Sequence, residues 1–142
     1  MTLASAESCT GGLLAKRLTD IPGASQVFSG GAVAYSLHAK TALLGVDPDL
    51  ISEKGAVSRE VATAMADGAR AKIEADIGIG ITGIAGPDGD GSGQDPGTVF
   101  IALATDSYSL CESLKLHGDR EQIRSASASH ALSMIQRFLD EK

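Results

Sequence analysis

The chain has 142 residues, of which 43% are hydrophobic, and a formal net charge of -6 at pH 7. A chain of this length can bury roughly 68 to 70% of its unfolded surface, which fits one globular domain over residues 1–142. The acidic balance argues against a nucleic-acid groove, and the absence of Trp argues against stacked bases. No apolar run approaches the roughly 18 residues that a membrane span needs, so we expect a cytoplasmic protein that binds no membrane.

The segment 6–12 (AESCTGG) follows a strand-like run at 2–5 and precedes a helix-like run at 13–18. This order predicts a strand-to-helix turn that exposes a hydroxyl, and Ser8 is the candidate nucleophile. Thr10 is a candidate cap for the new helix. The two glycines that end the segment leave room for a ligand beside the free N–H groups of the helix.

Hydrophobic periodicity and Gly or Pro breaks predict the remaining elements. A short buried strand is expected over 30–36, and further strands over 76–82, 97–105 and 107–116. Helices are expected over 38–44, 61–73 and from 119 onward. Pro48 and Gly55 are expected to break the stretch between the second and third helices. The order β-α-β-α-α-β-β-β-α predicts an α/β fold. We expect one three-layer α/β/α domain with a mixed, mostly parallel sheet and an antiparallel edge hairpin.

A serine hydroxyl is a weak nucleophile near neutral pH, so Ser8 needs a neighbouring base and an oxyanion site. Cys9 is the rival nucleophile, because a helix N-terminus can lower a thiol pKa. Alternate side chains in the turn should point apart, and we therefore expect Ser8 to face a cleft and Cys9 to face the core. The other cysteine, Cys111, has no metal-type spacing to Cys9, and both are expected to be reduced.

The base has several candidates. His38, His117 and His130 show no carboxylate partner in the sequence. Lys40 lies one helical turn after Tyr35, at the end of a strand expected to neighbour the first. A lysine acts as a base only when it is neutral, which requires a dry site that lowers its pKa. The alternative is an ordinary solvated lysine.

The loop 83–97 is rich in glycine and acidic residues. Asp88 and Asp90 match the early spacing of a calcium loop, but its twelfth position is Val99 instead of a bidentate Glu. We therefore predict no metal and no cofactor, and expect the start of the loop to present backbone N–H groups to a ligand.

Two arginines stand near the beginning of the last predicted helix. Arg120 and Arg124 are four residues apart, so they share one face and could bind a phosphate or a carboxylate. The alternative is a solvated face that pairs with Asp119 or Glu121.

Several motifs in this order resemble the C-terminal domain family of the competence/damage-inducible protein CinA, which includes nicotinamide mononucleotide amidohydrolases. The motifs are AESCTGG, GGAVAYSLHAK, LLGV, GAVS, TGIAGPDG, GTVFIA and GDREQIR. The resemblance implies hydrolysis of nicotinamide mononucleotide to nicotinate mononucleotide and ammonia, in pyridine nucleotide salvage. It also implies a metal-free homodimer or higher homo-oligomer.

Residue roles follow from the same resemblance. Ser8 would be the nucleophile, Lys40 its base and later the proton donor to ammonia, and Tyr35 an assisting group. Oxyanion donors would come from Thr10-Gly11 or from Thr82-Gly83, and Arg124 would contact the nucleotide phosphate. The full set of expected substrate-binding residues is Glu7, Thr10, Gly11, Gly31, Thr82, Gly83, Ala85, Gly86 and Arg124. The rival function is a nucleotide-binding or partner-docking module that has kept the cleft and lost catalysis.

Overall fold

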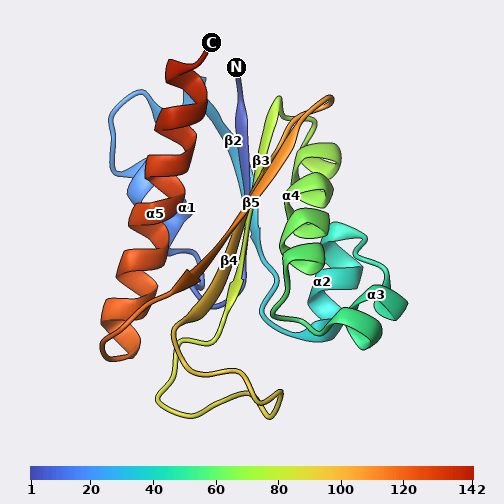
Figure 1. Cartoon of the computed structure of the whole chain (residues 1–142). Coiled ribbons are helices and arrows are strands. Elements are labelled where there is room, and N and C mark those ends of the chain that lie inside the picture. Colours follow the sequence, from blue (N-terminus) through green and yellow to red (C-terminus); the bar gives the residue numbers. More distant parts are fainter.

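A five-stranded sheet separates two layers of helices in the structure, a computed structural model that describes residues 1–142 (Figure 1). The strands are β1 (Leu3–Glu7), β2 (Phe28–Val33), β3 (Ile77–Gly83), β4 (Thr98–Ala104) and β5 (Ser109–Lys115). The helices are α1 (Leu13–Thr19), α2 (Leu37–Leu44), α3 (Pro48–Lys54), α4 (Arg59–Ile73) and α5 (Arg120–Asp140), with a short 3-10 turn at Ala24–Gln26.

The sheet order is β2-β1-β3-β4-β5. β1 pairs in parallel with both β2 and β3, whereas β4 is antiparallel to β3 and to β5. Because β5 reverses direction again, every strand except β4 points the same way. This arrangement confirms the predicted mixed sheet with an antiparallel edge hairpin.

Each face of the sheet has its own apolar core. Helices α1 and α5 cover one face, where Leu14 and Met134 are buried. Helix α4, flanked by α2 and α3, covers the other face. Gly78 and Gly80 of β3 let α4 come close, because a Cβ there would lie 2.0 and 2.2 Å from carbonyl oxygens of the helix. The sequence predicted such a close approach from the alternating glycines.

The structure corrects three local predictions. Pro48 begins the extra helix α3 instead of only breaking the chain, because proline suits a first helical turn and the Asp47 side chain caps it. Strand β2 is an edge strand with alternating exposure, not a buried one. Thr10 does not cap α1. The N-cap residue of this helix is Gly12, which has no side chain to accept a hydrogen bond. None of the helices combines the length and the apolar character that crossing a membrane requires.

Candidate active site

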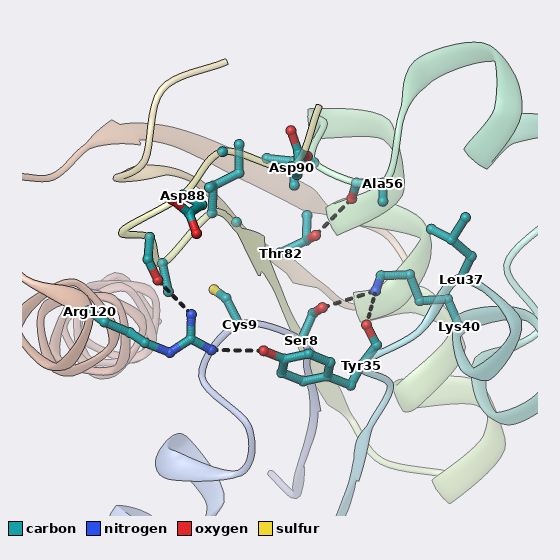
Figure 2. A pocket seen from close by; sticks show the side chains of 16 residues that line it. Ser8, Cys9, Tyr35, Leu37, Lys40, Ala56, Thr82, Asp88, Asp90 and Arg120 are labelled. Atoms are coloured by element: carbon teal, nitrogen blue, oxygen red, sulfur yellow. Dashed lines mark hydrogen bonds between the residues drawn. The ribbon is translucent and has the colours of Figure 1, made fainter. Parts of the chain in front are cut away.

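A pocket of about 230 Å³ lies where β1 and β3 end. Five segments line it: the turn after β1, the segment from Tyr35 to Lys40, the residues Ala56 and Val57, the end of β3 with the loop that follows it, and Arg120 of α5. Ligands of open α/β sheets commonly bind outside the carboxyl ends of the parallel strands. The pocket therefore occupies the expected edge of the sheet (Figure 2).

Ser8 and Lys40 meet in this pocket. The Nζ atom of Lys40 lies 2.9 Å from the Oγ atom of Ser8, although the residues are 32 positions apart in the chain. The same nitrogen donates to the carbonyl oxygen of Ala34 at 2.9 Å and to that of Tyr35 at 3.4 Å. These acceptors fix the direction of the amine, so it points at the serine hydroxyl.

Burial controls the protonation of Lys40. Its side chain is only 2% exposed, and no carboxylate lies within ion-pair distance of it. Burial lowers the pKa of the Lys40 amine below its ordinary value of 10.5, because a buried ammonium loses its hydration. A lysine with this environment can act as a base nearer to neutral pH than a solvated one.

Cys9 lines the same pocket as its neighbour Ser8, but its side chain also packs into the apolar core. It is 5% exposed and belongs to the apolar core with Leu14. Burial raises the pKa of its thiol to about 11, so the reactive thiolate is scarce at neutral pH. The prediction that this side chain packs in the core is confirmed, but Cys9 also lines the pocket, so the two neighbouring side chains are not separated as fully as expected. Both cysteines are free thiols.

Glu7 has a different contact from the one expected. Its carboxylate is 1% exposed and accepts the N–H groups of Leu14 at 2.8 Å and Ala15 at 3.0 Å. It thus satisfies the free donors at the beginning of α1, the task that the sequence assigned to Thr10. Glu7 is a support for the Ser8 turn and does not line the pocket.

Arg124 also differs from its prediction. Its Nε atom donates to the carbonyl oxygen of Cys9 at 3.0 Å and its Nη2 atom to that of Thr10 at 2.9 Å. The side chain is outside the pocket lining. The assignment of Arg124 to a substrate phosphate does not fit this position, because its donors hold the turn that carries Ser8.

Arg120 is the arginine that lines the pocket. Its guanidinium donates to the carbonyl oxygen of Gly86 at 2.7 Å and to the phenol oxygen of Tyr35 at 2.9 Å, as Figure 2 shows. The phenol of Tyr35 therefore meets Arg120, and only its backbone carbonyl meets Lys40. The four-residue spacing predicted that both arginines share one helix face, but it did not indicate which of them reaches the pocket.

Three more predicted contacts lie away from the pocket. Thr10 is fully buried and its hydroxyl has no hydrogen-bond partner. The N–H group of Gly11 already donates to the carbonyl oxygen of Ser8 at 3.0 Å. Gly31 packs against β1, because a Cβ there would lie 2.2 Å from the hydroxyl of Ser5. Their contribution is to the shape of the turn and the sheet.

All of the remaining predicted catalytic and substrate-binding residues line the pocket. The predicted residues in its wall are Ser8, Tyr35, Lys40, Thr82, Gly83, Ala85 and Gly86. The hydroxyl of Thr82 donates to the carbonyl oxygen of Ala56 at 2.7 Å, which ties β3 to the segment after α3. The loop also adds Asp88 and Asp90 to the pocket wall, two residues whose sequence spacing resembled only part of a calcium loop. No three His, Cys, Asp or Glu side chains are grouped to hold a metal ion.

The fold and the pocket together define a three-layer α/β domain with a buried serine–lysine pair. A sequence model of the CinA C-terminal domain family matches residues 1–139, so the chain belongs to that family. It is 49% identical over 138 residues to a CinA-like protein of Acidobacterium capsulatum, covering 97% of this chain and 33% of that protein. A CinA-like protein of Geotalea daltonii is 51% identical over 138 residues, with the same coverage. The chain thus spans about a third of the length of these curated relatives.

Solved structures share the fold. The competence-damaged protein (CinA) superfamily protein from Escherichia coli has a TM-score of 0.94 at 33% identity, covering 97% of this chain and 80% of that chain. The competence/damage inducible protein CihA from Agrobacterium tumefaciens has a TM-score of 0.93 at 37% identity, covering 96% of this chain and 84% of that chain. The predicted family and fold class are both confirmed.

Proposed function

We propose that this chain is an amidohydrolase that converts nicotinamide mononucleotide to nicotinate mononucleotide and ammonia in pyridine nucleotide salvage. The observation that carries the proposal is the 2.9 Å approach of the buried Lys40 amine to the Ser8 hydroxyl. The reaction needs a nucleophile, a base with a lowered pKa and a pocket, and all three coincide here. The identity of the substrate rests on the family resemblance.

The neutral form of Lys40 suits the first step. A neutral amine has two N–H groups, for which the carbonyl oxygens of Ala34 and Tyr35 are the acceptors, and one lone pair, which then faces Ser8. Lys40 takes the hydroxyl proton as the Ser8 oxygen attacks the carboxamide carbon. The ammonium so formed returns a proton to the departing nitrogen, which leaves as ammonia. Water, activated by the same amine, then hydrolyses the ester on Ser8 and releases nicotinate mononucleotide.

Backbone N–H groups are the candidate oxyanion donors. Those of Cys9 and Thr10 make no hydrogen bond within the protein, nor do those of Ala85 and Gly86 on the facing loop. By contrast, the N–H group of Gly11 is already engaged. We therefore narrow the expected donors on the first turn to Cys9 and Thr10. The loss of one such donor typically slows an enzyme by about 10²- to 10³-fold.

Arg120 replaces Arg124 as the proposed contact of the phosphate. It lines the same pocket as Ser8 and its guanidinium is held in place by Gly86 and Tyr35. A planar guanidinium with several donors suits a phosphate group. Tyr35 then acts by orienting Arg120 and forming the pocket wall, because its phenol is hydrogen-bonded to Arg120 and not to the Ser8 hydroxyl.

Ammonia release from nicotinamide mononucleotide tests the proposal in wild type, Ser8→Ala, Lys40→Ala and Cys9→Ala. Ser8→Ala and Lys40→Ala should each reduce kcat by about 10³-fold or more, because nucleophile and base act as one unit. Cys9→Ala should keep a substantial part of the activity. Tight binding without turnover in the wild type would instead favour a nucleotide-binding module. Activity that survives Ser8→Ala but not Cys9→Ala would assign the chemistry to the thiol.

A further inference from the structure

Arg124 contacts the turn that follows Ser8 through two different donor atoms. Its Nε atom lies 3.0 Å from the carbonyl oxygen of Cys9, and its Nη2 atom lies 2.9 Å from that of Thr10. The Thr10 oxygen also accepts the N–H group of Leu13 at 3.1 Å, whereas the Cys9 oxygen has no other hydrogen bond. The peptide group between Cys9 and Thr10 therefore takes its orientation from Arg124.

This orientation reaches one of the two N–H groups beside the nucleophile that have no partner in the protein. They are the N–H groups of Cys9 and Thr10. A peptide group is planar and trans, so its N–H bond points opposite to its C=O bond. The N–H group of Thr10 shares a peptide group with the carbonyl of Cys9, and Arg124 thus sets its direction.

The second donor of Arg124 reaches the N–H group of Cys9 through one further hydrogen bond. The carbonyl of Thr10, which Nη2 contacts, shares its peptide group with the N–H of Gly11. That N–H group donates to the carbonyl oxygen of Ser8 at 3.0 Å, and the Ser8 carbonyl shares its peptide group with the N–H of Cys9. Both free N–H groups are therefore oriented by one side chain that lies outside the pocket lining.

We propose that Arg124 is a positioning residue that keeps the N–H groups of Cys9 and Thr10 oriented for the oxyanion of the tetrahedral intermediate. The inference rests on the proposed function and adds the side chain that fixes these donors before the substrate binds. Such a residue acts on the transition state and not on the bound ground state, so its loss lowers kcat and leaves KM unchanged. We expect a loss of about 10²-fold, the size that a small misplacement of catalytic donors produces.

Arg124→Lys is the test variant, because it keeps the charge and loses the fork of donors that contacts two carbonyl groups. Arg17→Lys is the matched control. Arg17 joins α1 to α5 by hydrogen bonds of 2.7 to 3.1 Å to Ser125 and Ser129, and it makes no hydrogen bond to the Ser8 turn. Arg124→Lys should reduce kcat for ammonia release about 10²-fold at unchanged KM, and Arg17→Lys should change neither. Urea unfolding shows whether both variants keep the fold.

Two ligands separate the positioning of oxyanion donors from the binding of the nucleotide. An analogue with an aldehyde in place of the carboxamide forms a hemiacetal adduct with Ser8. The Ser8 oxygen bonds to the aldehyde carbon, the π electron pair moves to the former carbonyl oxygen, and the hydroxyl proton passes to Lys40. The product, nicotinate mononucleotide, binds without reaction. Arg124→Lys should weaken binding of the aldehyde about 10²-fold and leave the dissociation constant of the product unchanged.

Equal weakening of both ligands would assign Arg124 to substrate binding and overturn its positioning role. Unchanged affinity for the aldehyde, the same effect from Arg17→Lys, or a wild type that binds the aldehyde no more tightly than the product would also overturn it. If Arg124→Lys does not fold, Arg124→Gln is measured in its place with the same expectations. A wild type that releases no ammonia but binds the aldehyde through Arg124 would refute the amidohydrolase and keep the oxyanion site.

Discussion

Lys40 is a lysine that is buried without a carboxylate partner, which is unfavourable for the fold. It is 2% exposed, its partners are neutral, and burial lowers the pKa of its amine. A residue of this kind is retained at a cost in stability when its chemistry is needed. The lowered pKa should appear in the pH dependence of the activity, and the cost of burial should appear in the stability of the domain.

The activity should depend on pH through Lys40. Only the neutral amine can accept the Ser8 proton, so kcat/KM should rise with pH and level off above the pKa of Lys40. The midpoint should lie below 10.5, since burial lowers this pKa. Lys40→Arg should be inactive at every pH, because a guanidinium does not lose its proton. A profile that is flat from acidic to alkaline pH would contradict the role of a titrating lysine.

Replacing Lys40 should raise the stability of the domain, although it abolishes the activity. The folded pKa of Lys40 is lowered, so the unfolded chain binds its proton more tightly, and this disfavours folding at every pH below the folded pKa. Lys40→Met should therefore raise the free energy of unfolding near neutral pH by about 1 kcal/mol. The gain should shrink as the pH rises toward 10.5. Urea unfolding checks it, with Lys54→Met on the exposed surface as control; a mutant less stable than wild type near neutral pH would contradict the account.

At the scale of elements, the short helix α1 depends on a carboxylate from the strand before it. Glu7 of β1 accepts two N–H groups of α1 from a buried position, and the Ser8 turn lies between them. The capping contact and the position of the nucleophile are therefore coupled. Substituting Glu7 should affect stability and activity together.

Glu7→Ala leaves buried N–H groups without an acceptor, which should reduce the free energy of unfolding by about 1 to 3 kcal/mol. Glu7→Gln retains one acceptor oxygen and should recover part of this loss. Both variants should lower kcat, because the turn that orients Ser8 loses its support. Denaturant unfolding and ammonia release on the same samples check the coupling. Full stability in Glu7→Ala would show that the helix does not need this cap.

At the scale of the whole molecule, one charged cluster joins the edge of the sheet to the helical layer. Glu112 of β5 lies 2.5 Å from the Nε2 atom of His130 and 2.9 Å from the Nη2 atom of Arg137, both on α5. The hydrogen bond from His130, followed by that from Arg137, lowers the pKa of the Glu112 carboxyl below its ordinary value of 4.5. The cluster fastens the last strand to the last helix.

A lowered carboxyl pKa gives stability that is present above 4.5 and is lost as the pH falls through the folded value. Glu112→Gln should therefore destabilise the domain near neutral pH by about 0.5 to 1 kcal/mol, the size of a partly exposed ion pair. The difference from wild type should vanish in acid, where both side chains are uncharged. Thermal unfolding across this pH range checks the trend, and a difference that grows in acid would contradict it.

The order of elements was predictable because glycine and proline mark the turns and the apolar periods mark the elements. Helix α3 was missed because Pro48 was interpreted only as a breaker, although proline also suits the beginning of a helix. The pairing of Ser8 with Lys40 could be proposed because both follow strands predicted to be neighbours. The choice between Arg120 and Arg124 depends on how α5 crosses the end of the sheet, which no local pattern specifies.

The central claim is that Ser8 forms a covalent ester with the substrate after Lys40 removes its proton. The most direct measurement is mass spectrometry of the wild-type protein quenched in acid during turnover of nicotinamide mononucleotide, followed by peptide mapping. We expect the acyl adduct on the peptide that contains Ser8, at the serine oxygen, and no adduct in Ser8→Ala. An adduct on Cys9, or undiminished ammonia release by Ser8→Ala, would contradict the account.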